Sequence, residues 1–591
     1  MGLGLGFEIK KVFEQIYSIG RVKNFVGFLE PTFFCYNTVM KTLPKFIILF
    51  SIILPASSLA AGLDYASIYK LANEKIIIQN GALETKTYSL CQVANLSCQN
   101  IGSNELVATP TDDLEQKSIL ANLKTTYSEI WNSSRIQFST TNRYLVYYIS
   151  SKVNKDQYRR HIVIDLKNTE TPKRSEIKNQ IKNWDLLTEE NRLFSFSPDE
   201  SFFIYVDDRG GYPTLYQANL PQTGKTLVSK KLFARNYSIG DFLVWDKNTL
   251  YFYANRDGTN TWTLYRYKLD TGDLKKIAGD ISYGEKIYRS DDYLLFTHLV
   301  KNRKLVSRYD PTDGSIKNFV TASIANPFPN LVRKETTLAG RQASIVRTTK
   351  TPGKPLIIWL HGGPYRQIAP VGTYHAYQSY AVYDWMLDQL AEGGAIVAKV
   401  DYVGSYGYGR QFADSIVGQV GQKDVADVLA VTKELKALYN PSSIYLIGNS
   451  YGGYLALRTL VEKPADYKGV VSINGVTDWT KLLEHYQNSI FNTYFKGLRA
   501  DDNDSLFQQA NITTRLDRVT NQKILLVQNS ADKTIPPVQA SWLAGILEAR
   551  HKPFDYVTYA GEDHVFAQSK NLVNLCQKIN DLVKTKAKCE W

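Results

Sequence analysis

The stretch Gly448-Asn449-Ser450-Tyr451-Gly452-Gly453 sets the architecture of the C-terminal part of this 591-residue chain. It follows the apolar run Ile444-Tyr445-Leu446-Ile447 and precedes the helix-like segment Tyr454-Leu455-Ala456-Leu457-Arg458. A Gly-x-Ser-x-Gly turn between a buried strand and a helix is typical of a nucleophile elbow, in which the glycines let the strand and the helix approach closely. The turn exposes the serine hydroxyl and directs the next backbone N–H, that of Tyr451, toward a developing oxyanion. The sequence therefore predicts Ser450 as a nucleophile.

Two later stretches supply the base and the acid that a serine nucleophile requires. Residues 523–528 predict a buried parallel strand with Asp532 in the loop after it, and residues 554–559 predict the next strand, followed by the loop that carries His564. Open α/β sheets collect their sites beyond the carboxyl ends of the strands. In α/β-hydrolases the residues arrive in the order Ser, Asp, His, so we expect the triad Ser450, Asp532 and His564.

Two other carboxylates, Glu562 and Asp563, adjoin His564 directly. A neighbour in sequence rarely reaches the correct ring nitrogen. Asp532, which arrives on a separate loop, can approach Nδ1 while Nε2 faces Ser450. We therefore choose Asp532 as the acid.

An oxyanion hole needs a second N–H from the loop after an earlier strand. The apolar run Leu356-Ile357-Ile358-Trp359-Leu360 predicts that strand, and His361-Gly362-Gly363-Pro364 follows at once. Its glycines permit close approach of the backbone and supply N–H groups. We expect His361 to shape this loop rather than to act as a base.

Four motifs now carry a resemblance to a known family. They are His361-Gly362-Gly363-Pro364, the loop Asp401-Tyr402-Val403-Gly404-Ser405-Tyr406-Gly407-Tyr408-Gly409-Arg410, the segment Gly421-Gln422-Lys423-Asp424-Val425-Ala426-Asp427, and residues 448–454. Together they resemble the prolyl oligopeptidase family of serine peptidases, over about residues 333–591. The first motif is most similar to the acylaminoacyl-peptidase branch, and the Ser-Tyr-Gly-Gly-Tyr run is similar to the dipeptidyl-peptidase branch. The resemblance implies Ser450 as nucleophile, Asp532 as acid and His564 as base, with the N–H groups of Tyr451 and Gly363 as the oxyanion hole.

The chain also departs from the family pattern. The family usually carries His-Gly a few residues before the catalytic Asp, and Gln528-Asn529 stands here. Val403 replaces a usual Arg, and Asp563 and Val565 replace small residues around the histidine. None of these changes removes a catalytic group, but they leave the branch, and hence the substrate, open.

The length of 591 residues is too great for one core, so at least two domains are expected. We expect an α/β-hydrolase domain with a doubly wound, mostly parallel sheet at 326–591. At 62–325, short Tyr/Phe/Ile/Val runs alternate with Asp/Asn/Gly/Pro turns and recur every forty to fifty residues or so, which favours an all-β propeller of six or seven blades over a sandwich. We expect segments 194–199, 244–246 and 289–292 to start such units, and segments 270–273 and 310–314 to be hairpin turns within them. The stretch 323–332 is the expected linker to the hydrolase domain. The resemblance implies that this propeller caps the hydrolase and admits only short peptides.

The N-terminus predicts export. A basic region, an apolar run too short to span a bilayer stably and small residues at a plausible cleavage site form a signal peptide at 40–61. We interpret residues 1–39 as an extension added by the gene prediction. A membrane anchor is the alternative, and the polar and small residues from Pro55 onward argue against it. We thus expect a periplasmic or secreted protein without a stable membrane anchor after processing.

Cysteine usage agrees with export, because removal of the presequence leaves an even set of four. Three pairings are open. Cys91–Cys98 would staple a short hairpin, and Cys576–Cys589 would tie the C-terminal tail to the last helix. The alternative is free thiols, and no Cys or His spacing predicts a metal.

The formal charge of +13 could suggest nucleic acid as a partner. However, Lys and Arg are dispersed and form no basic run, so we expect no nucleic-acid binding. The sequence predicts an exported serine peptidase that acts on short peptides without a metal or an organic cofactor. A carboxylesterase of the same fold and a non-catalytic binding protein that uses the propeller are the alternatives.

Overall fold

The computed structural model describes residues 75–80, 84–89, 119–123 and most of 136–590, with the longest gaps at 183–193 and 369–380. All elements discussed below belong to one compact unit, Asp64–Trp591. The segments 1–39 and 40–61, together with Cys91 and Cys98, lie outside the described residues.

The C-terminal part is built on an eight-stranded sheet in the order β20-β21-β23-β22-β24-β25-β26-β27. The strands are β20 (Val332–Leu338), β21 (Arg341–Arg347), β22 (Leu356–Leu360), β23 (Ile396–Val400), β24 (Ile444–Asn449), β25 (Gly469–Ile473), β26 (Lys523–Asn529) and β27 (Phe554–Tyr559). Strand β21 pairs antiparallel with both β20 and β23, and every pair from β23 to β27 is parallel. The expected mostly parallel sheet is therefore present, and β22, β24, β26 and β27 lie where the sequence places them.

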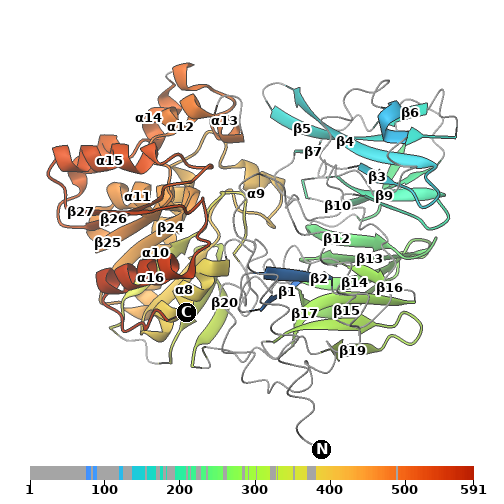
Figure 1. Ribbon diagram of the computed structural model, residues 1–591, viewed down its shortest axis with the longest axis horizontal. Coiled ribbons are helices and arrows are strands. Elements are labelled where there is room, and N and C mark those ends of the chain that lie inside the picture. Colours follow the sequence, from blue (N-terminus) through green and yellow to red (C-terminus); the bar gives the residue numbers. More distant parts are fainter. Residues whose placement is uncertain are drawn as a thin grey trace, which may run out of the picture. The chain divides into compact units, whose positions relative to one another are not determined.

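Helices cover both faces of this sheet, which is why its central strands, β22 to β25, are buried at every position and largely apolar. Along β22, Leu356, Ile358 and Leu360 pack into one core, whereas Ile357 and Trp359 pack into the other. The helices are α8 (Ala381–Glu392), α10 (Lys423–Tyr439), α11 (Tyr451–Glu462), α15 (Val538–Ala549) and α16 (Ser569–Val583). Side chains of α10, α11 and α15 belong to the first core and those of α8 and α16 to the second, and the two layers can be followed in Figure 1.

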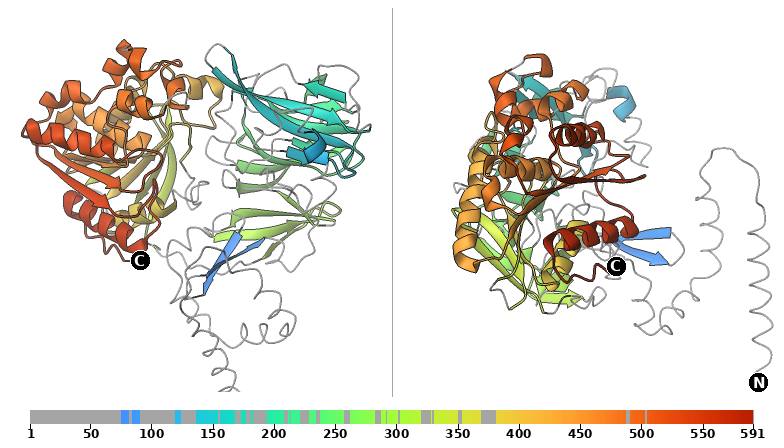
Figure 2. Two further views of the ribbon diagram at one scale, coloured as in Figure 1. Left: turned by 45° about the horizontal axis from the view of Figure 1, so that its top comes forward. Right: turned by 90° about the vertical axis from the view of Figure 1, so that its left-hand side faces the viewer.

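Antiparallel sheets of four or five strands form most of the described part of the N-terminal half. The strands of the first are β3 (Ile136–Phe138), β4 (Tyr144–Val153), β5 (Asp156–Asp165) and β6 (Lys173–Glu176), and β7 (Ile181–Lys182) also pairs with β5. The second holds β8 (Phe194–Phe196), β9 (Phe202–Asp207), β10 (Thr214–Asn219) and β11 (Ser229–Lys231). The third holds β12 (Ile239–Val244), β13 (Thr249–Ala254), β14 (Trp262–Lys268) and β15 (Leu274–Ile281). The fourth holds β16 (Tyr288–Ser290), β17 (Tyr293–Val300), β18 (Arg303–Tyr309) and β19 (Ile316–Phe319). They follow one another in chain order, from cyan through green to yellow-green in Figure 2. Strand β1 (Lys75–Asn80) pairs with β2 (Glu84–Ser89) in a separate sheet, drawn in blue.

The repeated sequence segments fall at the same position in successive sheets. The segments 194–199, 244–246 and 289–292 each include the end of a first strand and the turn to the second. We expected them to start successive units. For 244–246 this was wrong, because β12 begins five residues earlier, at Ile239. The expected hairpin turns at 270–273 and 310–314 do connect strands, joining β14 to β15 and β18 to β19.

Four consecutive sheets of this kind have the form of propeller blades. The described strands pair only within their own sheets, and they do not form a closed barrel. Closure and a blade number of six or seven therefore stay predictions. The expected linker, 323–332, falls between the end of β19 at Phe319 and the start of β20 at Val332.

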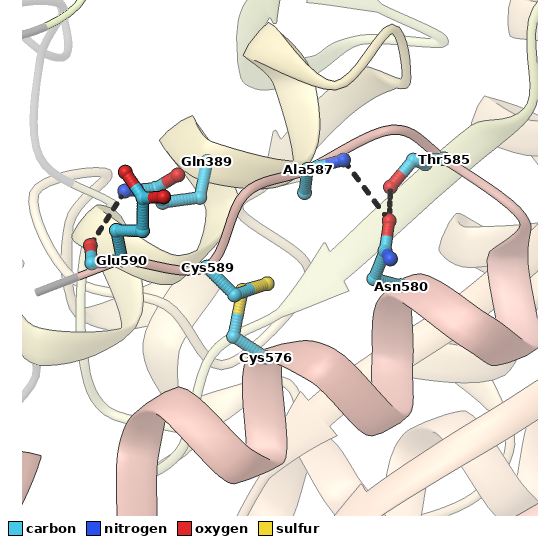
Figure 3. Close-up of a disulfide and its surroundings, with 7 residues drawn as sticks. All are labelled: Gln389, Cys576, Asn580, Thr585, Ala587, Cys589 and Glu590. Carbon is cyan, nitrogen blue, oxygen red and sulfur yellow. Dashed lines mark hydrogen bonds between the residues drawn. A yellow bond between two sulfur atoms is a disulfide. The ribbon is translucent and has the colours of Figure 1, made fainter. Parts of the chain in front are cut away.

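The C-terminal tail returns to the sheet's helices (Figure 3). Cys576 on α16 is bonded to Cys589, thirteen residues later. The N–H of Lys586 donates to the carbonyl oxygen of Gly393 at 2.8 Å, and the Gln389 side chain donates to the Glu590 carbonyl oxygen at 2.9 Å. The tail is thus fastened to α16 by the disulfide and to the end of α8 by hydrogen bonds. Among the helices that the structure describes, none is both long enough and apolar enough to cross a membrane.

Candidate active site

The turn at Ser450 has the geometry of an elbow. Ser450 follows β24 and precedes α11, with φ 58° and ψ −122°, a left-handed conformation that is uncommon outside glycine. Glycine is required around it, because a Cβ on Gly452 would lie 1.9 Å from the Leu360 carbonyl oxygen. A Cβ on Gly448 would lie 2.2 Å from the Gly452 carbonyl oxygen. The two glycines therefore allow α11 to start directly against the sheet.

The loops after β26 and β27 bring Asp532 and His564 together. Oδ2 of Asp532 lies 2.8 Å from Nδ1 of His564. The other oxygen, Oδ1, accepts hydrogen bonds from the backbone N–H groups of Thr534 and Ile535, both at 2.8 Å. The carboxylate is therefore fixed on its own loop while it holds the imidazole ring.

The neighbouring carboxylates have other partners. Oδ1 of Asp563 accepts from the backbone N–H groups of His564 at 2.7 Å and Lys533 at 3.0 Å, and these bonds hold the pKa of Asp563 below its usual range. Glu562 is buried and accepts from the backbone N–H of Ala567 at 2.7 Å, among other groups near the start of α16. The geometry therefore favours Asp532 over both as the partner of the imidazole, while the catalytic roles themselves stay predictions.

The loop after β22 lies beside the elbow, because β22 and β24 are parallel neighbours. Gly363 has φ +123°, and a Cβ there would lie 2.7 Å from the Tyr365 nitrogen. Within this loop, Nδ1 of His361 lies 2.8 Å from the Gly362 carbonyl oxygen, and Nε2 lies 3.0 Å from Oγ of Ser405. His361 is buried with both ring nitrogens engaged inside the protein, as expected for a residue that shapes the loop.

A buried carboxylate holds the side chain next to the nucleophile. The Tyr451 hydroxyl donates to Oδ2 of Asp424 at 2.7 Å, and the N–H groups of Gly421 and Val425 donate to the same carboxylate at 3.2 and 2.9 Å. Burial raises the pKa of Asp424 to about 6, in spite of these bonds. Burial and the nearby Asp424 charge also raise the pKa of Tyr451 well above its usual value. The sequence contained Asp424 only as part of a motif, and nothing in its spacing indicated this partner.

Sequence reasoning also missed two buried asparagines, Asn474 and Asn529, that contact the loop of His564. Asn529 was visible only as a departure from the family pattern, and Asn474 carried no signal. In the described part of the chain, no group of three or more His, Cys, Asp or Glu side chains is arranged to hold a metal ion.

Comparison with known families now bears on this geometry. Residues 381–589 match the family model described as the prolyl oligopeptidase family. This part of the chain is a prolyl oligopeptidase family domain. The family is one of serine peptidases, and the resemblance inferred from the motifs is thereby confirmed. The matched residues of the prolyl oligopeptidase family domain include Ser450, Asp532 and His564.

Curated relatives resemble mainly this domain. The chain is 27% identical over 225 residues to dipeptidyl aminopeptidase BIII of Pseudoxanthomonas mexicana, a match that covers 37% of this chain and 31% of the relative. It is 23% identical over 233 residues to prolyl endopeptidase FAP of Mus musculus, covering 39% of this chain and 29% of the relative. The matches therefore span about a third of the length of these relatives.

Solved structures show a likeness of fold that extends beyond the prolyl oligopeptidase family domain. A puromycin-hydrolyzing peptidase of Mycobacterium tuberculosis aligns with a TM-score of 0.61 at 18% identity, over 78% of this chain and 70% of the other. Dipeptidyl peptidase 4 of Porphyromonas gingivalis aligns with a TM-score of 0.62 at 17% identity, over 77% of this chain and 63% of the other. Alignments of this extent include both the hydrolase sheet and part of the N-terminal half.

Proposed function

We propose that this protein is a serine peptidase that hydrolyses short peptides through Ser450, His564 and Asp532. The observation that carries the proposal is the 2.8 Å hydrogen bond between Asp532 and His564. It lies beyond the carboxyl ends of β26 and β27, and the elbow lies beyond the carboxyl end of the parallel strand β24. This combination of nucleophile, oriented base and acid is the one that acyl transfer requires.

In the first half of the reaction, Oγ of Ser450 attacks the scissile carbonyl carbon and gives its proton to Nε2 of His564. Asp532 holds the ring by Nδ1 and stabilises the resulting imidazolium. The oxygen of the tetrahedral intermediate carries a negative charge, and the N–H groups of Tyr451 and Gly363 donate hydrogen bonds to it. The C–N bond then breaks, the leaving amine takes the proton from His564, and an acyl-enzyme remains on Ser450.

In the second half, a water molecule replaces the amine. His564 takes a proton from the water as its oxygen attacks the ester carbonyl of the acyl-enzyme. Collapse of the second tetrahedral intermediate breaks the bond to Ser450, which recovers its proton from His564. Water is the only co-reactant, so the protein contributes positioning and electrostatic stabilisation.

We infer that the N-terminal sheets restrict access to this site as a propeller. The likeness to solved peptidases extends over 78% of the chain, and four blade-like sheets precede the hydrolase sheet. A restricted enzyme would cleave short peptides and leave folded proteins intact. Equal cleavage of a short peptide and of a folded protein that contains the same sequence would contradict this proposal.

The competing activity is that of a carboxylesterase, because the same groups cleave esters. A panel of peptide and ester substrates, each measured with wild type and with Ser450→Ala, separates the two. Peptide hydrolysis that depends on Ser450 supports the peptidase, whereas ester hydrolysis alone supports the esterase. A wild-type protein that neither hydrolyses the panel nor reacts with a fluorophosphonate probe would instead be a binding protein.

We also propose that the protein is exported, on the basis of the signal-like segment at 40–61 and the even cysteine set. N-terminal sequencing of protein from its native host tests this directly. We expect a mature chain that begins near Ala61 or Gly62. A mature chain that retains residues 46–54 would indicate an anchored protein.

A further inference from the structure

We propose that Asn474 and Asn529 form a clamp that positions His564 for proton transfer, a role that rests on the triad proposed above. Both side chains are fully buried at the carboxyl ends of adjacent strands, β25 and β26. Each binds the backbone of the loop that carries His564, and neither is charged. They act on the base through its backbone, so they are positioning residues.

Asn474 binds two loops at once. Its Nδ2 donates to the carbonyl oxygen of His564 at 2.8 Å, and its Oδ1 accepts from the N–H of Asn529 at 2.8 Å. Its own N–H donates to the Val527 carbonyl oxygen at 2.8 Å. Asn474 has φ +49°, a left-handed conformation that asparagine tolerates better than most residues. The backbone and both ends of the amide are thus committed to fixed partners.

Asn529 holds the preceding carbonyl of the same loop. Its Nδ2 donates to the Asp563 carbonyl oxygen at 2.7 Å. Its own carbonyl oxygen accepts from the N–H of Asp532 at 3.3 Å. Consecutive carbonyl groups, those of Asp563 and His564, are therefore held by the two asparagines, while the same region fixes the loop of Asp532.

The nucleophile is bound to the same region. The N–H of Ser450 donates to the Ile473 carbonyl oxygen at 2.8 Å, and Ile473 is the residue just before Asn474. The Asn449 side chain donates to that oxygen as well, at 3.2 Å. The chain around Asn474 therefore connects the loops that carry the nucleophile, the acid and the base.

This arrangement gives a physical reason for a departure from the family pattern. Asn529 stands where the family usually carries glycine before the catalytic Asp, and glycine has no side chain to hold the Asp563 carbonyl. An amide suits the position because its Nδ2 donates to that carbonyl without adding charge near the imidazole. A carboxylate at Asn474 could still accept from Asn529, but it would direct an oxygen at the His564 carbonyl.

The experiment measures three clamp variants against one control. Asn474→Gly keeps the left-handed backbone and removes both side-chain bonds. Asn474→Asp keeps the acceptor and loses the donor, and Asn529→Ala removes the bond to Asp563. The control is Asn440→Gly, another left-handed asparagine (φ 42°), which ends α10. For each protein, kcat and KM are measured with a cleaved peptide, and the rate of Ser450 labelling is measured with a fluorophosphonate.

We expect kcat and the labelling rate to fall on the order of 10²-fold in the clamp variants, as for a displaced catalytic group, with KM little changed. In the double variant Asn474→Gly/Asn529→Ala, the loss of kcat should be far smaller than the product of the two single losses, because the two side chains hold one loop. The control should keep wild-type rates. If the Asn474 variants fail to fold, Asn529→Ala tests the clamp by itself, because the backbone at position 529 is not left-handed.

Folded clamp variants with wild-type labelling rates would overturn the clamp, and so would an equal loss in the control. These outcomes differ from failure of the proposed function. If wild type is labelled at Ser450 but cleaves no peptide, the proposed peptidase function is wrong. The labelling rates of the variants then still test the clamp. A wild-type protein that is not labelled overturns the nucleophile on which both proposals rest.

Discussion

Nδ1 of His564 is bonded to Asp532, thirty-two residues away in the chain, at 2.8 Å. Asp563, the immediate neighbour of His564, binds backbone N–H groups instead. The two carboxylates thus have different effects. One orients the imidazole ring, and the other fixes the backbone of the loop that presents it.

Replacing each carboxylate by its amide separates these effects. Asp532→Asn should lower kcat by about 10⁴-fold, because the amide favours the wrong tautomer of His564. Asp563→Asn should lower it only a few-fold, because the amide oxygen can still accept from both backbone N–H groups. Steady-state kinetics of the two purified variants provides the measurement. A reversed order of the two losses would assign the catalytic carboxylate to Asp563.

Ser450→Ala should lower kcat by about 10⁴- to 10⁶-fold. Alanine keeps the Cβ and removes only the hydroxyl, so the melting temperature should stay close to that of wild type. Kinetics and thermal unfolding of the same preparation check both parts. Substantial activity in the folded variant would refute Ser450 as the nucleophile.

Gly452→Ala should destabilise the protein by about 3 kcal/mol or more, because its Cβ would lie 1.9 Å from the Leu360 carbonyl oxygen. The matched control is Gly545→Ala in α15, where a Cβ meets nothing within 4 Å. That change should stabilise by up to about 1 kcal/mol, through the higher helix propensity of alanine. Denaturant unfolding measures both. Equal effects at the two sites would show that close approach at the elbow is not what requires glycine.

Asp424 should make stability depend on pH. Its pKa is raised from the usual 3.8 to about 6 in the folded protein, so the neutral form is favoured there. The resulting stabilisation is complete below about pH 3.8 and is lost as the pH rises through about 6. Relative to Asp424→Asn, wild type should therefore lose about 2 kcal/mol between pH 4 and pH 7, most of the full effect of the pKa shift. Denaturant unfolding of both proteins across this range tests the expectation, and parallel stability curves would contradict it.

The Cys576–Cys589 bond closes a short loop, and in the chain-entropy account its loss costs about 3 kcal/mol. Reductant should lower the free energy of unfolding of wild type by this amount. In the double variant Cys576→Ala/Cys589→Ala, any effect of reductant on the free energy of unfolding comes from other cysteines. Titration of thiols in denaturant, with and without reductant, shows whether the pair is oxidised. If, without reductant, wild type has two more titratable thiols than the double variant, Cys576 and Cys589 are not bonded and the prediction is wrong.

The sequence predicted best where chemistry and local structure coincide. Ser450 lies between an apolar strand and a helix, and glycines are required around it because a Cβ on Gly452 or Gly448 would lie only 1.9 or 2.2 Å from a carbonyl oxygen. A short motif therefore implies the elbow. The strand before Asp532, β26, is a mostly buried apolar run, and β27 before His564 is rich in aromatic and β-branched residues. Both patterns made the strand ends, and hence the loops, recognisable. The pairing of Cys576 with Cys589 was also among the expected alternatives.

The remaining features depend on contacts between distant segments. Asn474 and Asn529 bind backbone carbonyl groups, which leave no mark on the sequence of the partner. Asp424 reads as an ordinary helix N-terminal acid, and only the packing of α10 against α11 brings it to Tyr451. The sheets of the N-terminal half were visible as a repeat, but turn residues do not determine how many blades close a ring.

The order of strands in the hydrolase sheet has a consequence for biosynthesis. Strands β22, β24 and β25 assemble the elbow and the loop of Gly363, whereas the acid and the base follow β26 and β27 at the far edge of the sheet. During translation the chain therefore carries its nucleophile well before its base. On the mechanism proposed here, a nascent peptidase is inert until these outer strands have joined the sheet, and so it completes its own folding before it can cleave a neighbour.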